Sequence, residues 1–115
     1  MAEAKAQSEW VVDARNLRWE YDSKWFQIPK MNNGKANGLQ LRPFMEQSGL
    51  SKAELKRIWR LSDLDKDGKM GSEEFALCLL LMDEALSGKG IPDQLPMDYI
   101  PPSVWLTLYI PLYSH

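Results

Sequence analysis

Apolar residues recur at helical spacing in four segments of the chain, and polar or glycine-rich stretches separate these segments. In the first segment Leu17, Tyr21 and Trp25 are four residues apart, and Pro29 ends the helix that they predict. The predicted helices cover about residues 15–28, 39–47, 52–62 and 72–86. The pattern therefore predicts an all-α fold, and we expect both Trp25 and Trp19 in its core.

Capping and turn residues mark the ends of these helices. Pro43 is expected in the first turn of the second helix, where proline is tolerated. Ser51 and Glu54 have the spacing of a capping box, so the third helix should begin at Lys52. Gly88 is expected to end the fourth helix.

The loop between the third and fourth helices has the spacing of a calcium-binding EF-hand loop. Such a loop needs oxygen ligands at positions 1, 3 and 5, glycine at 6, a backbone carbonyl at 7 and a bidentate glutamate at 12. Residues 63–74 supply these groups in order as Asp63, Asp65, Asp67, Gly68, Lys69 and Glu74. Magnesium prefers a tighter oxygen shell than a bidentate glutamate gives. We therefore expect one Ca²⁺ ion here, with a solvated acidic turn as the alternative.

A second, degenerate loop lies upstream, at about residues 29–40. With Gly34 at position 6, the ligand positions hold no carboxylate and are occupied by Pro29, Met31, Asn33 and Gln40. This loop should not bind calcium, and it should pair with the acidic loop through Ala36 opposite Met70. The expected fold is a pair of EF-hands with four main helices, a short antiparallel β bridge between the loops and a proline-rich C-terminal tail. A single ion favours a structural role over a calcium switch.

Composition restricts the class of protein. The formal net charge is −2 and the pI is about 5.4, which argues against a nucleic-acid-binding protein. The single cysteine, Cys78, lies in an apolar helix and is expected in the core. Residues 1–8 have no apolar signal region, and the apolar run from Phe75 to Met82 is far shorter than the roughly 20 residues of a membrane span.

Several motifs together resemble the EH-domain family. They are the capping box, the segment Ile58-Trp59-Arg60-Leu61-Ser62-Asp63, the acidic loop, Glu73-Glu74-Phe75-Ala76-Leu77, and the tail Ile91-Pro-Asp-Gln-Leu95-Pro96 with Ile100-Pro101-Pro102-Ser103. The leading Glu9-Trp10-Val11-Val12 and the Asn33-Gly34-Lys35 loop are most similar to the C-terminal EH domain of EHD-type membrane-remodelling ATPases. The resemblance assigns residues 9–103 to the domain. It leaves residues 1–8 as a flexible N-terminus and 104–115 as an apolar tail without an assigned role.

The resemblance implies a pocket for Asn-Pro-Phe peptides between the second and third helices. Trp59 would form its floor, and Leu55 and Met45 would form its apolar walls. Leu55 and Trp59 lie one helical turn apart, and apolar walls with an aromatic floor suit a proline and a phenyl ring. The competing interpretation places all three side chains in the core.

Positive charge gathers on the same helix. Many EH domains have glycine where this chain has Lys56, and two consequences are open: the long cation crowds the peptide, or it attracts an acidic residue after the motif. Together with Lys52, Arg57 and Arg60 it could meet acidic peptide residues or phosphoinositide headgroups, or form an ordinary solvated helix face.

The expected function is a non-enzymatic, calcium-binding protein-interaction module of endocytic recycling, located in the cytoplasm and at endosomal or plasma membranes through its partners. Those partners would carry Asn-Pro-Phe motifs. The alternatives are a calcium sensor that exposes a groove on metal binding and a phosphoinositide-assisted targeting module. An enzyme is poorly supported, because the chain has no phosphate-binding Gly-x-x-x-x-Gly-Lys-Ser/Thr motif and no internal histidine.

Overall fold

The computed structural model describes residues 10–103, so the predictions for residues 1–8 and 104–115 lie outside the described residues. The expected all-α fold with a small sheet is confirmed. Its elements are α2 (Val11–Ala14), α3 (Arg18–Gln27), β1 (Ala36–Asn37), α4 (Gly38–Glu46), α5 (Lys52–Ser62), β2 (Lys69–Met70), α6 (Ser72–Leu86) and the 3₁₀ turn η1 (Met97–Tyr99).

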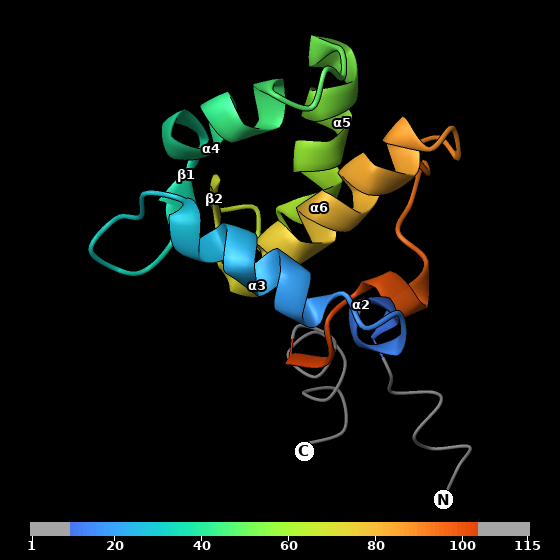
Figure 1. The fold of residues 1–115 in the computed structure, drawn as a ribbon, viewed down its shortest axis with the longest axis horizontal. Coiled ribbons are helices and arrows are strands. Elements are labelled where there is room, and N and C mark those ends of the chain that lie inside the picture. The colour runs from blue at the N-terminus through green and yellow to red at the C-terminus, as the bar shows by residue number, and fades with distance from the viewer. Residues whose placement is uncertain (1–9, 104–115) are drawn as a thin grey trace, which may run out of the picture.

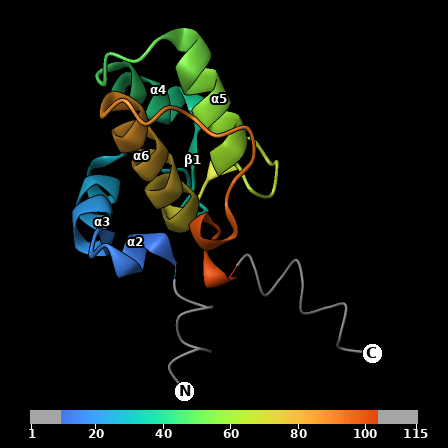
Figure 2. The same cartoon turned by 90° about the vertical axis from the view of Figure 1, so that its right-hand side faces the viewer.

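Helix α6 is the centre of the fold. Every residue from Phe75 to Met82 is buried, including Cys78, so this helix is enclosed on all sides rather than amphipathic. It packs against α3 on one side and α5 on the other (Figures 1 and 2). Burying each of its leucines contributes about 1.5–3 kcal/mol to folding.

Helix α5 begins where its capping box predicts. The Glu54 backbone N–H donates to Ser51 Oγ at 3.1 Å, and the Ser51 N–H donates to Glu54 Oε1 at 2.9 Å. Two backbone donors at the helix start are thereby satisfied, an arrangement worth about 1 kcal/mol.

Helix α3 starts later than predicted, at Arg18, because Asn16 has a positive φ of 58° and separates it from α2. Tyr21 and Trp25 are buried, but the prediction of a core Trp19 is wrong, since its side chain is 81% exposed. Trp19 precedes Tyr21 by two residues, which is roughly 200° around a helix, and so it lies on the opposite face.

The EF-hand loops are joined by the predicted β bridge. Ala36 pairs with Met70 and Asn37 with Lys69 in antiparallel register. Asn37 also caps α4, which therefore begins at Gly38 and places Pro43 inside the helix rather than in its first turn. Helix α4 tolerates this proline because the carbonyl that loses its partner belongs to Leu39, which is exposed at the helix start.

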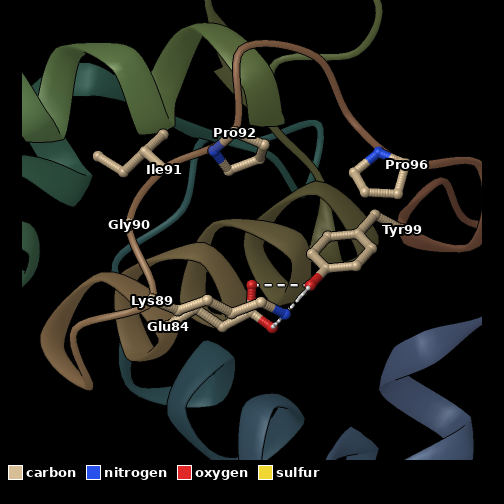
Figure 3. A pocket seen from close by; sticks show the side chains of 7 residues that line it. All are labelled: Glu84, Lys89, Gly90, Ile91, Pro92, Pro96 and Tyr99. Carbon is tan, nitrogen blue, oxygen red and sulfur yellow. Dashed lines mark hydrogen bonds and ion pairs between the residues drawn. The ribbon is translucent and has the colours of Figure 1, made fainter.

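The proline-rich tail lies along the domain and crosses α5 and α6 (Figure 2). An Arg57 guanidinium N–H donates to the Ile91 carbonyl at 3.1 Å. Further on, η1 brings Tyr99 onto α6, where its hydroxyl donates to the buried Glu84 carboxylate at 2.7 Å (Figure 3). A cavity of about 220 Å³ remains between the tail and the end of α6.

Candidate functional site

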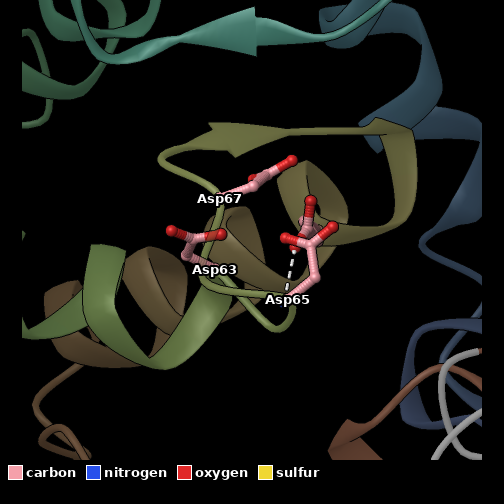
Figure 4. Close-up of side chains that lie close together, drawn as sticks. Asp63, Asp65 and Asp67 are labelled. Carbon is pink, nitrogen blue, oxygen red and sulfur yellow. Dashed lines mark hydrogen bonds between the residues drawn. The ribbon is translucent and has the colours of Figure 1, made fainter.

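The four carboxylates predicted from spacing converge in the loop between α5 and α6. Asp63, Asp65, Asp67 and Glu74 each offer an oxygen, and these oxygens lie within 4.8 Å of one another. Figure 4 shows the side chains of Asp63, Asp65 and Asp67 projecting close together from the loop backbone. Gly68, with φ of 76°, makes the sharp turn that brings them together. The Gly68 N–H donates to Asp63 Oδ2 at 3.0 Å and fixes the first of them.

One oxygen in this loop has no hydrogen-bond partner within residues 10–103. Asp63 Oδ1 is buried and accepts no hydrogen bond among the described residues, although its side chain is a charged acceptor. Burial raises the pKa of Asp63 against the opposing hydrogen bond from the Gly68 N–H, and the negative charge of the Asp67 carboxylate adds to the rise. A buried carboxylate oxygen without a donor is costly, and a cation would remove that cost. The donor set therefore fits a hard cation, with the Lys69 carbonyl as the expected further ligand.

Glu74 ties the two ends of the loop together. Its Oε1 accepts the Gly71 N–H at 3.0 Å and its Oε2 accepts the Leu64 N–H at 2.8 Å. Burial raises its pKa, because desolvation exceeds the effect of these hydrogen bonds. Its Oε2 also accepts a longer hydrogen bond from the Asp65 N–H at 3.4 Å, whereas within the described residues Oε1 accepts the Gly71 N–H alone and keeps a lone pair for a metal ion. Glu74 thus stands at the loop with an oxygen available to a cation.

Lys35, which the sequence analysis did not single out as a site residue, reaches the same loop from the upstream one. Its ammonium lies 2.7 Å from Asp67 Oδ2 and 3.2 Å from Asp65 Oδ2. Hydrogen bonds to Asp67 and then Asp65 raise the pKa of Lys35, and the bond from Lys35 holds the pKa of Asp67 below its ordinary value. The predicted pairing of Ala36 with Met70 could have revealed this contact. Lys35 immediately precedes Ala36, so the pairing brings Lys35 close to the acidic loop.

The upstream loop is held by its own hydrogen bonds. Gln40, at the position equivalent to Glu74, accepts the Asn37 N–H at 2.9 Å, and Asn37 Oδ1 accepts the Gln40 N–H at 2.9 Å. A neutral amide here reproduces the backbone contact that Glu74 makes to Gly71. Unlike a carboxylate, this amide supplies no negative charge for a cation.

A groove of about 640 Å³ lies between α4 and α5. The three predicted pocket residues line it together: Met45 from α4, and Leu55 and Trp59 from α5. Met45 and Leu55 are 6% and 9% exposed, while Trp59 is only partly buried. Sequence spacing could not decide whether these three side chains are core residues or pocket residues. In the structure they do both: they pack against the hydrophobic core and also line an open groove.

The rim of the groove carries charged groups of both signs. Lys52 and Lys56 line it from α5, and Arg42 and Glu46 line it from α4. The latter two form an i, i+4 ion pair at 2.8 Å. Neither residue was predicted from the sequence. Arg42 precedes Met45 by three residues and so shares its face of α4, and Glu46 lies beside Arg42, four residues further along the helix.

The four cations predicted as one cluster separate into two groups. Arg57 and Arg60 line a smaller cavity of about 120 Å³ against the tail, together with Leu61, Pro92 and Asp93. An Arg57 nitrogen lies 3.4 Å from Asp93 Oδ1 in addition to its bond to Ile91. Consecutive residues point about 100° apart around a helix, so Lys56 faces the groove while Arg57 faces the tail.

None of the helices in the described part of the chain has the length and apolar character that crossing a membrane requires.

Comparisons with known proteins identify the fold. A family model described as "EH domain" matches residues 18–105. Mouse intersectin-1 is 42% identical over 103 residues, which cover 90% of this chain and 6% of that protein. Rat EH domain-containing protein 2 is 38% identical over 96 residues, covering 84% of this chain and 17% of that protein, in keeping with the expected likeness to EHD-type proteins. The chain therefore spans only a small part of the curated relatives that it matches.

A solved structure supports the same assignment. The structure described as the second EH domain of AtEH1/Pan1 superposes with a TM-score of 0.65 at 30% identity, covering 69% of this chain and 76% of that one. Family model, relatives and fold thus agree with the resemblance inferred from the motifs. This chain belongs to the EH-domain family, whose members are protein-interaction modules of endocytic proteins.

Proposed function

We propose that this EH domain binds Asn-Pro-Phe peptides in the groove between α4 and α5. The observation that carries the proposal is the arrangement of Met45, Leu55 and Trp59 around one open cavity. A partly exposed indole beside two buried aliphatic walls gives a phenylalanine ring an apolar surface to replace water. An Asn-Pro turn is already restricted in conformation, so ordering it on binding costs little entropy.

The second part of the proposal is that Asp63, Asp65, Asp67 and Glu74, with the Lys69 carbonyl, hold one calcium ion. The ion would neutralise the carboxylates at the junction of α5 and α6. Since Asp63 directly follows α5 and its N–H donates to the carbonyl of the groove residue Trp59, a fixed loop helps to hold the groove wall in place.

Lys52 and Lys56 support a preference for peptides with acidic residues after the motif, because they stand at the groove rim. Arg57 and Arg60 face the tail, and Arg57 already bonds Ile91 and Asp93. A phosphoinositide contact through all four cations is therefore the weaker proposal. We further propose a cytoplasmic location, with recruitment to endosomal or plasma membranes through partners, and a binding role rather than catalysis.

A calcium sensor is the competing function. Sensors use ion binding to expose an apolar groove. Here the first loop has the amide of Gln40 at position 12 and no carboxylate at its other side-chain ligand positions, which supports a single structural ion. The two roles differ in whether micromolar calcium changes the apolar surface of the folded domain.

An NMR titration with an Asn-Pro-Phe peptide tests the proposal, with calcium and with chelator. Chemical-shift changes should gather at Met45, Leu55 and Trp59, and Trp59→Ala should abolish binding. Trp19→Ala is the matched control, since its indole is exposed on α3, a helix that does not line the groove, and it should bind like the wild type. Shifts confined to α6, or binding by Trp59→Ala at wild-type strength, would overturn the site.

A further inference from the structure

Lys35 places a positive charge of the protein itself on the carboxylates of the calcium loop. It belongs to the upstream loop, 30 residues before Asp65 and 32 before Asp67. The β bridge fixes this approach, because Ala36, the next residue, is paired with Met70 and is fully buried. The Lys35 side chain is 32% exposed, so part of it packs against the protein while its ammonium meets the loop.

The two acceptors are the side chains at ligand positions 3 and 5. Without a positive charge, three aspartates and a glutamate whose oxygens lie within 4.8 Å would repel one another. The ammonium offsets part of this repulsion by its contacts at 2.7 and 3.2 Å. It makes no hydrogen bond to Asp63 Oδ1, which is buried, accepts none from the described part of the chain and still favours a cation at the centre of the loop.

We propose that Lys35 is an internal counter-cation of this loop, which keeps the carboxylates together when no metal is bound and lowers the affinity of the loop for calcium. The inference rests on the proposed calcium site. A calcium ion and the ammonium compete for the same carboxylate charge, and they repel each other when both are present. By thermodynamic linkage, the calcium-binding free energy that is lost to competition with Lys35 should be recovered when the lysine charge is removed.

An ordinary surface ion pair contributes little to stability and would not affect metal binding. Lys35 differs from such a pair because both of its partners are expected metal ligands. Lys66 provides the comparison within the same loop. It carries the same charge, but its ammonium donates to the Arg60 carbonyl at 2.9 Å and makes no ion pair within 4 Å among the described residues.

Calorimetric calcium titrations of the 115-residue chain in about 0.1 M KCl test the inference with three variants. Lys35→Met removes the charge and keeps the length, and it should bind calcium about tenfold more tightly than the wild type. Lys35→Arg keeps the charge and should stay within about twofold of the wild type. Lys66→Met should tighten binding no more than about twofold, because its charge acts only at longer range.

Thermal unfolding gives a second readout that does not depend on calcium affinity. In EGTA, Lys35→Met should unfold several degrees below the wild type, since its carboxylates repel without an ammonium, and saturating calcium should remove this difference. Equal or weaker calcium binding by Lys35→Met, or equal tightening by Lys66→Met, would overturn the role of Lys35. A wild-type chain that binds no calcium would instead overturn the calcium site itself.

Discussion

The indole N–H of Trp10 donates to the backbone carbonyl of Tyr99 at 2.8 Å, across 89 residues of sequence. Both residues are buried, and the Arg18 guanidinium lies 5.0 Å from the centre of the Trp10 ring. The contact joins the first described turn of the chain to the end of the proline-rich tail. The tail is thereby fixed at this end as well as at Arg57.

Replacing Trp10 by Phe should destabilise the domain by about 2–4 kcal/mol, because it leaves a cavity and a buried carbonyl without its donor. Urea unfolding followed by circular dichroism measures the loss. Trp19→Phe is the control, since an 81% exposed side chain should change stability by no more than about 0.5 kcal/mol. Equal losses in the two variants would contradict the anchoring role of Trp10.

A second anchor of the tail should make stability depend on acid pH. Burial alone would raise the pKa of Glu84, but hydrogen bonds from Tyr99, Arg15 and Lys89 outweigh it and hold the pKa below its ordinary value. A lowered folded-state pKa stabilises the fold above the unfolded-state value of about 4.3. This stabilisation is lost as the pH falls through the folded-state pKa.

Glu84→Gln should therefore lower stability at pH 7 by about 1–3 kcal/mol and flatten the fall in stability between about pH 5 and pH 3. Urea midpoints measured across this range check both effects. Glu20→Gln removes an exposed carboxylate and should keep the wild-type slope. The same slope in Glu84→Gln would show that the tail anchor does not titrate as proposed.

The local elements could be predicted from sequence because their determinants are local. Helical spacing identified α6, the Ser51–Glu54 pair identified the start of α5, and fixed loop spacing identified the converging carboxylates. The bridge between Ala36 and Met70 followed from aligning the two loops.

The remaining contacts depend on where distant segments meet. Trp10 and Tyr99 could not be paired from sequence, since no periodicity links positions 89 residues apart. Lys56 and Arg57 were predicted in one cluster but lie on different faces of α5. Grouping charges by their proximity in sequence ignores the angle of about 100° between neighbouring residues on a helix. Trp19 was wrongly predicted in the core for a similar reason. The prediction rested on its aromatic side chain and ignored its angle around α3, which points it away from the core.

Glu74→Gln should reduce stability more in calcium than in chelator. In chelator we expect a loss of about 1–2 kcal/mol, because the amide replaces one of two oxygens that accept backbone N–H groups from Leu64 and Gly71. In calcium the variant should also lose the stabilisation by the bound ion, which is about 2.7 kcal/mol at 100 times Kd.

Thermal unfolding in EGTA and in excess calcium separates these two contributions. Glu73→Gln removes the same charge one residue earlier, at a position that is not a ligand position of the loop, and should keep the stabilisation by calcium. A Glu74→Gln domain whose unfolding temperature rises with calcium as much as the wild type would exclude Glu74 as a ligand.

Lys56→Gln should distinguish the two roles left open for this cation. If Lys56 attracts an acidic residue after the Asn-Pro-Phe motif, the variant should bind an acidic peptide about 3–10 times more weakly, and the difference should shrink in about 0.5 M salt. Binding of a peptide with neutral flanking residues should not change. Arg60→Gln removes a charge from the face of α5 toward the tail, so it should leave both peptides unaffected. Tighter binding of both peptides by Lys56→Gln would instead mean that the long side chain obstructs the groove.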